Sequence, residues 1–206
     1  MDESYKKHWE KVYETKNPDQ VSWTQEIPQT SLDFMHSFQL PKTAKIIDVG
    51  GGESKLVDHL LNEGFENITV LDISEKALEK TKKRLGENAS KVNWIVSNIL
   101  DFKPDRKFDL WHDRATFHFL TTPEQITKYV EISENAIDGY LILGTFSDKG
   151  PTKCSGLEIT QYNQEKLAAE LRKNFTKIHC VEEIHTTPFG TSQHFLFCSF
   201  KKQGQD

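Results

Sequence analysis

The sequence is most informative at first for what it lacks. None of its apolar runs approaches the roughly 20 residues that cross a bilayer, and its first residues, MDESYKKHWEKVY, lack the apolar segment of a secretory signal. There is no basic excess either, since 26 Lys and Arg stand against 31 Asp and Glu, for a net charge of -5. Nucleic acid is bound by clustered positive charge. We therefore expect a soluble, cytoplasmic protein with no membrane or nucleic-acid partner, and a monomer from its size and charged composition.

Cysteine is also scarce. Cys154, Cys180 and Cys198 are odd in number and widely spaced, which favours reduced thiols over a disulfide framework. No CxxC or HxxxH pair indicates a structural metal, and we expect no metal site. A chain of 206 residues can bury a core without such supports. We expect one domain over 1–206, with 1–40 as an N-terminal helical extension.

What the sequence does contain is an alternation of short apolar runs with helical patterns, which predicts an α/β fold. The first five runs are almost continuously apolar, as in a parallel sheet covered on both faces. The last two flank the turn TTPFGTS and predict an antiparallel hairpin at the end of the sheet. The seven predicted strands are 45–49, 67–73, 92–98, 108–113, 140–146, 177–185 and 192–200.

The N-termini of three helices can be predicted from capping residues. One follows Ser54 and ends at Gly64, and a second starts at Ser74 with an acidic first turn. A third opens with Thr122, Pro123 and Gln125, the pattern of a capping box, and its buried stripe is expected to run from Ile126 to Ile137.

The stretch IIDVGGGESKLVDHLLNEGFENITVLDIS indicates a nucleotide-like ligand. Glycines after a first strand let the backbone turn sharply and approach a ligand closely. The dinucleotide fingerprint requires glycines at positions one, three and six, but counting from Gly50 the sixth residue is Lys55. Asp72 follows Gly50 by 22 residues, and its carboxylate can accept hydrogen bonds from both ribose hydroxyls of an adenosine. An adenosine ligand without a pyrophosphate is favoured, and the alternative is a tight turn with Asp72 capping a helix.

These residues resemble those of the class I S-adenosylmethionine-dependent methyltransferases. Asp48, Gly50, Gly51 and Gly52 match the family's acidic and glycine-rich turn, while Ser54 departs from its usual third alternate glycine. The resemblance implies a seven-stranded, mostly parallel, Rossmann-like sheet with helices on both faces and a C-terminal antiparallel hairpin. It further implies S-adenosyl-L-methionine as cofactor, bound by the glycines, by Asp72 and Ile73, and by Asn98 with Ile99, where the family usually has an acid.

The cofactor half is most similar to the methyltransferase-like branch that includes the elongation factor 1A lysine methyltransferases. The aromatic segment YKKHWEKVYETKNPDQVSW, the turn GFENITVLD and the run DRAT carry this likeness. It implies that Tyr5, Trp9, Trp23 and Arg114 lie beside the cofactor, Arg114 near the cofactor's carboxylate. The aromatic residues are interpreted either as permanent core or as a lid over the methyl group. Beyond Leu120 the likeness ends, so it does not identify the substrate.

The catalytic candidates follow the fourth strand, at the sheet edge where ligands of α/β folds bind. We consider His112, Asp113 and His118 as groups that could accept a proton from the nucleophile. The structural alternative for the histidines is burial with a hydrogen bond to the backbone, and for Asp113 a salt bridge to Arg114. Cys154, His185 and His194 are more readily explained as loop or sheet-edge residues than as part of the site.

Three functions fit these residues. The first is a methyltransferase acting on a small-molecule nucleophile. The second is a protein lysine methyltransferase, and the third is a non-catalytic module that binds S-adenosylmethionine.

Overall fold

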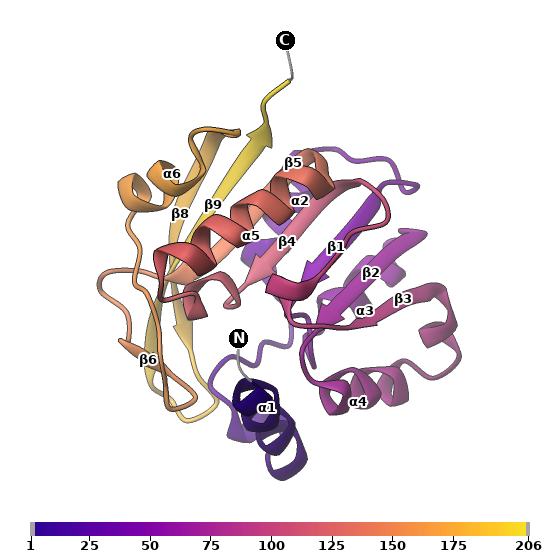
Figure 1. Ribbon diagram of the computed structural model, residues 1–206. Coiled ribbons are helices and arrows are strands. Elements are labelled where there is room, and N and C mark those ends of the chain that lie inside the picture. The colour runs from indigo at the N-terminus through magenta and orange to yellow at the C-terminus, as the bar shows by residue number, and fades with distance from the viewer. Residues whose placement is uncertain (1–2, 205–206) are drawn as a thin grey trace.

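A seven-stranded sheet forms the centre of the molecule, in the order β3-β2-β1-β4-β5-β9-β8. The structure is a computed structural model that describes residues 3–204. Strands β1 to β5 pair in parallel, and β9 runs antiparallel to both β5 and β8 (Figure 1). The strands are β1 Lys45–Val49, β2 Asn67–Asp72, β3 Val92–Val96, β4 Phe108–Arg114, β5 Ile137–Phe146, β8 Phe175–Thr186 and β9 Ser192–Lys202.

Helices cover both faces of this sheet and bury two separate cores. Helices α1, α2, α3 and α4 contribute to the core on one face, while α5 and α6 contribute to the core on the other. The expected fold class is confirmed, including the reversed C-terminal hairpin. The helices are α1 Glu3–Thr15, α2 Gln29–Ser37, α3 Leu56–Asn62, α4 Glu75–Leu85, α5 Pro123–Ala136 and α6 Gln164–Leu171.

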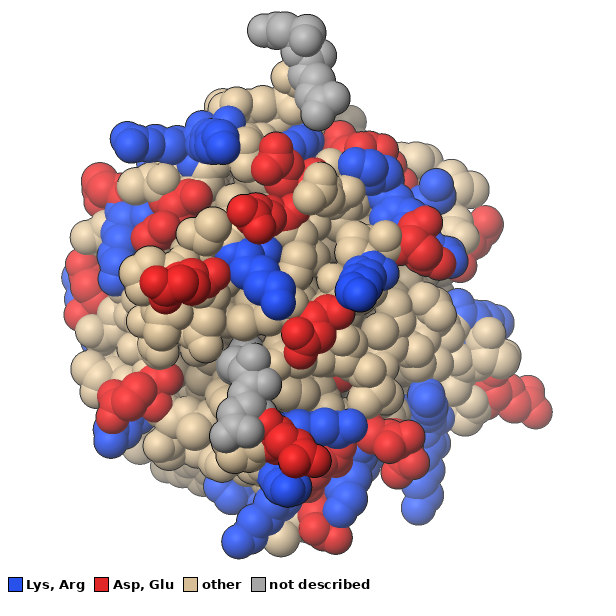
Figure 2. All heavy atoms as spheres, viewed as in Figure 1, with Lys and Arg blue, Asp and Glu red and all other residues tan. Residues whose placement is uncertain are grey.

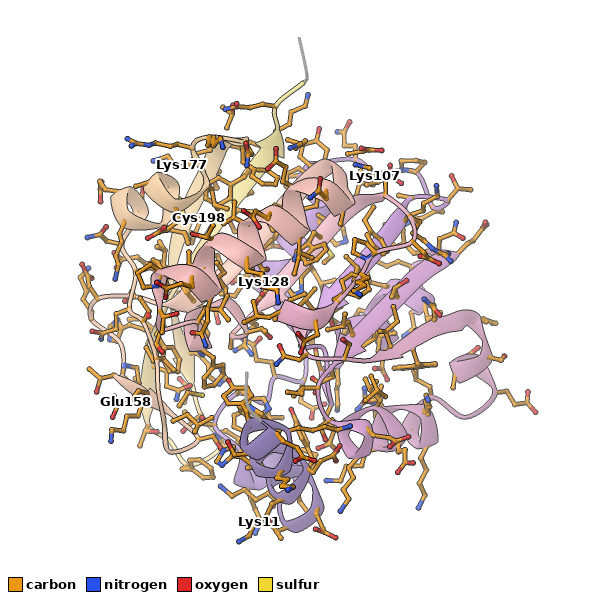
Figure 3. All side chains as sticks on the ribbon, in the orientation of Figure 1. Lys11, Lys107, Lys128, Glu158, Lys177 and Cys198 are labelled. Carbon is orange, nitrogen blue, oxygen red and sulfur yellow. A yellow bond between two sulfur atoms is a disulfide. The ribbon has the colours of Figure 1, made fainter. Side chains whose placement is uncertain are left out.

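The predicted helix caps form. The Ser74 hydroxyl accepts from the Ala77 N–H at 3.2 Å at the start of α4, and Thr122 and Gln125 form a reciprocal capping box at the start of α5. One boundary differs from the expectation: Ile137, expected on the helix stripe, is the first residue of β5. A short ribbon of β6 Lys153–Cys154 and β7 Leu157–Glu158 was not expected, and Figure 3 labels Glu158 on it.

The cysteine pairing corrects the sequence-based expectation of three reduced thiols. Cys180 on β8 and Cys198 on β9 lie directly opposite each other in the antiparallel register and form a disulfide with a Cα–Cα distance of 4.1 Å. Figure 3 labels Cys198 in the C-terminal half of the sheet. Cys154 is free and buried. Two cysteines 18 positions apart become neighbours only once the hairpin register is fixed, which their spacing alone does not reveal.

Residues 3–204 contain neither a membrane-spanning helix nor a metal-binding cluster. None of the helices there is long and apolar enough to cross a membrane. In the same residues, no group of three or more His, Cys, Asp or Glu side chains could hold a metal ion.

Thiol counting tests the disulfide. In denaturant without reductant we expect one reactive thiol, that of Cys154, and after reduction we expect three. Cys154→Ser should lower both counts by one. Because the bond closes a loop of 18 residues, reduction should lower the free energy of unfolding by about 3 kcal/mol. Three reactive thiols in the unreduced protein would contradict the pairing.

Candidate active site

A cavity of about 370 Å³ opens at the carboxyl ends of β1, β2 and β4, beneath α1 and the segment that follows it. Eleven of the residues expected in the site line this cavity, although they come from positions throughout the first 114 residues. They are Tyr5, Trp9, Trp23, Gly50, Gly51, Asp72, Ile73, Asn98, Ile99, His112 and Arg114. Gly52, Asp113 and His118 are not among the lining residues.

The glycine turn is required by the protein's own packing as well as by any ligand. Gly50 has φ +69°, and a Cβ there would lie 1.8 Å from the Thr116 hydroxyl oxygen. Gly52 has φ +40°, and a Cβ there would lie 2.8 Å from the Tyr13 hydroxyl. The backbone therefore passes closely between the segment after β4 and helix α1. The carbonyl of Gly52 accepts a hydrogen bond from the Thr81 hydroxyl of α4 at 2.7 Å, which holds the turn in place.

Asp72 ends β2 as a buried carboxylate, with only 5 % of its surface exposed. Burial raises its pKa to about 7, and the nearby charges of Asp48 and Glu10 add to this effect. Its Oδ1 accepts from the Ser74 N–H at 2.8 Å. The residue that caps α4 is Ser74, so the alternative of Asp72 as the helix cap does not hold. An acidic side chain held in this way can accept hydrogen bonds from ligand hydroxyls.

His112 lies in a buried chain of three polar side chains. Its Nδ1 donates to Asp48 Oδ1 at 2.7 Å, and its Nε2 lies 2.9 Å from the Ser31 hydroxyl. A carboxylate can only accept, so the proton of the neutral ring lies on Nδ1. Nε2 therefore accepts a hydrogen bond from the Ser31 hydroxyl. Ser31 on α2 was not identified from the sequence, where no motif marks it. All three residues line the cavity.

Asp113, a catalytic candidate from the sequence, does not line the cavity, and it does not form the salt bridge to Arg114 that was its structural alternative. Its Oδ2 accepts from the Tyr129 hydroxyl at 2.7 Å, and its Oδ1 accepts from the N–H groups of Thr116 and Phe117. Burial raises its pKa to about 6. Asp113 therefore joins β4 to α5 and to the following turn, away from the cavity.

His118 is enclosed as well, in the short 3-10 turn Phe117–Phe119. Its Nδ1 accepts from the Phe146 N–H at 3.3 Å. Burial, followed by the positive charge of Arg114, lowers its pKa to about 3, so the ring is neutral. This matches the structural alternative of a buried histidine bonded to the backbone.

An aromatic roof, formed by Tyr5, Trp9, Tyr13 and Trp23, covers the cavity. Trp9 packs edge-on against Trp23 and Phe119, with ring centroids 5.7 and 5.3 Å apart. The Glu10 carboxylate fixes α1 to the start of α4 by accepting from the Glu75 N–H at 2.8 Å and the Lys76 N–H at 3.2 Å. A negative charge is favourable at a helix N-terminus.

Cys154 and Arg114 complete the lining on the side of the C-terminal strands. Burial raises the pKa of the Cys154 thiol to about 12, which keeps it neutral. Arg114 Nη1 donates to the Trp23 carbonyl at 2.9 Å. Cys154 was interpreted from the sequence as an ordinary loop cysteine, and β6 brings it to the cavity. His185 bonds the Ser22 carbonyl at 2.7 Å and is not among the lining residues.

The sheet order, the glycine turn after β1 and the acid at the end of β2 define a class I S-adenosylmethionine-dependent methyltransferase fold. A family model described as a methyltransferase domain matches residues 40–203, and the chain belongs to that family. The resemblance inferred from the sequence motifs is thereby confirmed.

Relatives of known activity modify different kinds of substrate. The chain is 28% identical over 151 residues to EEF1A lysine methyltransferase 2 of Danio rerio, covering 69% of this chain and 65% of the relative. It is 30% identical over 106 residues to the malonyl-[acyl-carrier protein] O-methyltransferase of Anoxybacillus flavithermus, covering 50% and 39%. The chain thus spans less than two thirds of either relative's length.

Among solved structures, the chain resembles 1,6-didemethyltoxoflavin-N1-methyltransferase of Burkholderia thailandensis, which was determined with 1,6-didemethyltoxoflavin and S-adenosylhomocysteine. The TM-score is 0.68 at 18% identity, and the match covers 98% of this chain and 85% of the other. This likeness concerns the fold.

Asp72→Asn tests the buried carboxylate in two opposite ways. Affinity for S-adenosylhomocysteine should fall about 10- to 150-fold, the effect of losing hydrogen bonds to a charged group. The ligand-free variant should nevertheless melt higher than the parent at pH 8. The pKa of Asp72 is raised to about 7 on folding, so its ionisation destabilises the folded state increasingly from about pH 4 to about pH 7.

The melting-temperature gain of Asp72→Asn should therefore be negligible near pH 4 and largest above pH 7. Asp138→Asn, which changes an exposed carboxylate at the opposite end of the sheet, is the matched control and should show neither effect. Unchanged ligand affinity in Asp72→Asn, measured by calorimetric titration, would remove Asp72 from the binding site.

Proposed function

We propose that this protein transfers a methyl group from S-adenosylmethionine to a small-molecule nucleophile. The observation that carries the proposal is the concave cavity of about 370 Å³ lined by the aromatic roof, since a concave, largely apolar pocket suits a small ligand. Figure 2 supports it, because positive and negative side chains are interspersed on the face shown and no single-sign patch marks a docking surface.

The proposed cofactor position follows from the lining residues. Asp72 would accept hydrogen bonds from the ribose hydroxyls, and Ile73, Ile99 and Asn98 would contact the adenine. Gly50 and Gly51, which line the cavity, would border the amino-acid portion of the cofactor, while Gly52 supports the same turn. Asp48 Oδ2 is buried and has no hydrogen-bond partner within residues 3–204, so it is available to a cationic group of the ligand.

We assign proton removal to His112. A nucleophile that bonds the Ser31 oxygen can pass its proton to Ser31, while Ser31 passes its own proton to His112 Nε2. The Asp48 carboxylate then stabilises the imidazolium. Bound S-adenosylmethionine would supply the methyl group to the nucleophile, with S-adenosylhomocysteine as the leaving product. Asp113 and His118 take no part in this scheme, because both are enclosed outside the cavity.

Of the two other functions considered from the sequence, the protein lysine methyltransferase has specific support. The zebrafish relative is named as a lysine methyltransferase of EEF1A, and the net charge of -5 is suited to a basic protein substrate. A non-catalytic binding module would retain the cofactor site and lack turnover.

Labelled cofactor distinguishes the three functions. Incubation with methyl-labelled S-adenosylmethionine and a cell lysate should transfer label to the small-molecule fraction and produce S-adenosylhomocysteine. Asp72→Asn serves as the low-binding control. Label in the protein fraction would favour the lysine methyltransferase, and cofactor binding without any product would favour the binding module.

We also propose that α1 and the aromatic roof act as a lid over the cofactor. Because the aromatic side chains of this segment line the cavity and would contact bound ligand, amide hydrogens in residues 3–25 should exchange faster in the free protein than with S-adenosylhomocysteine bound. Glu10→Gln weakens the contact with α4 and should speed exchange in the free state further. Equal protection with and without ligand would instead make the aromatic residues permanent core.

A further inference from the structure

We propose that the Arg114 guanidinium binds a carboxylate of the methyl acceptor, so that the substrate is an aromatic or similarly flat acid. This inference rests on the proposed methyltransferase function and adds the chemical class of the acceptor. It also departs from the expectation that Arg114 contacts the carboxylate of the cofactor.

The first observation is an incomplete set of hydrogen bonds. Arg114 Nη1 donates to the Trp23 carbonyl, while Nε and Nη2 are buried and have no hydrogen-bond partner within residues 3–204. Nε and Nη2 form one edge of the planar guanidinium, the edge that binds a carboxylate through two parallel hydrogen bonds. Buried donors without partners are costly, and a bidentate oxyanion would satisfy both.

The second observation is that the guanidinium is held in place and stays charged. It lies over the ring of Phe195 on β9, 4.7 Å from the centroid. Burial lowers its pKa only to about 10, so the positive charge persists at neutral pH. A planar cation stacked on an aromatic ring and bonded to a backbone carbonyl has little freedom left, which favours binding of an anion.

The third observation is that the protein itself does not neutralise this charge by direct contact. Glu183 on β8 is near enough to raise the pKa of Arg114. Its Oε1 accepts a hydrogen bond from Gln25 at 3.0 Å, and its Oε2 is buried without a hydrogen-bond partner within residues 3–204. Among the ion pairs formed within residues 3–204, there is none between Arg114 and a carboxylate. The guanidinium thus keeps its capacity for an external anion.

The position of Arg114 in the sheet favours the acceptor over the cofactor as the source of the carboxylate. Asp72 ends β2, and β1 separates that strand from β4, which ends at Arg114. The neighbours of Arg114 lie on the other side, on β9 and in the segment of Trp23. Tyr5, Phe119 and the neutral Cys154 thiol also line the cavity, and such groups suit a flat aromatic body.

Both free nitrogens are covered in this structure. We therefore expect the carboxylate to reach them when the segment that carries Trp23 moves with the lid. Binding of the acid should then depend on Arg114 and much less on the other contacts of that segment.

Benzoate and benzamide, which are close in shape and differ in charge, are the probes. Each is titrated into protein saturated with S-adenosylhomocysteine. Benzoate should bind and benzamide should bind at least about 10-fold more weakly, as expected for losing a charged bidentate contact. Arg114→Met should weaken benzoate by about the same factor while its affinity for S-adenosylhomocysteine stays within about 3-fold. Arg114→Lys keeps the charge and loses the planar guanidinium that binds a carboxylate through two hydrogen bonds. Its affinity for benzoate should be intermediate.

His185→Phe is the matched control for loosening the Trp23 segment, since it removes the bond to the Ser22 carbonyl and keeps a ring. It should leave the preference for benzoate intact. If Arg114→Met does not fold, the ratio of benzoate to S-adenosylhomocysteine affinity in Arg114→Lys decides. An equal loss of both affinities would assign Arg114 to the cofactor's carboxylate and overturn the proposal. Failure of benzoate to bind the loaded parent would overturn it too, while failure of S-adenosylhomocysteine to bind would count against the proposed function instead.

Discussion

The parallel pairing of β1 with β2 and β4 is the constraint on which the whole site depends. It places the carboxyl ends of three strands at one edge, and in this register Asp48 lies opposite His112 while β2 ends at Asp72. Parallel strands require helical crossovers, so α3 and α4 follow β1 and β2. The glycine turn between β1 and α3 can then pass close to Thr116 and Tyr13. The strand positions of Asp48, Asp72 and His112 are thus set by backbone pairing that does not depend on a ligand.

The same arrangement concentrates negative charge where water is excluded. Asp72 is buried, and Asp48 and Glu10 are close enough to raise its pKa further. Glu10 is retained because it also fixes α1 to the first turn of α4. The empty site is therefore less stable than it would be with neutral side chains, and a ligand that donates hydrogen bonds to Asp72 relieves part of that penalty. At Asp72 the folded protein thus loses stability and gains affinity for its ligand.

Much of the fold could be predicted because its signals are local. The five apolar runs, the caps at Ser74 and Thr122, and the turn before β9 each follow from neighbouring residues. The disulfide and Ser31 could not be predicted in this way. Cys180 meets Cys198 only through the hairpin register, and Ser31 meets His112 only because α2 packs across the sheet. Contacts between distant segments depend on tertiary packing, which one sequence does not disclose.

The position of Asp113 outside the cavity can be predicted from the alternation of side chains along a strand. Successive residues of a strand face opposite sides, so along β4 the odd and even positions have different surroundings. Trp111 and Asp113 face α5, where the Trp111 N–H and the Asp113 carboxylate both bond the Tyr129 hydroxyl, at 2.9 and 2.7 Å.

His112 and Arg114 face the cavity. One strand thus separates a structural pair from a pair available to ligands. These two side chains lie two residues apart on the same face of β4. A nucleophile near His112 and an anion at Arg114 can therefore belong to one small molecule. The spacing of two strand residues, about 7 Å, is comparable to the width of an aromatic acid. That geometry joins the proposed proton transfer and the proposed substrate class in a single site.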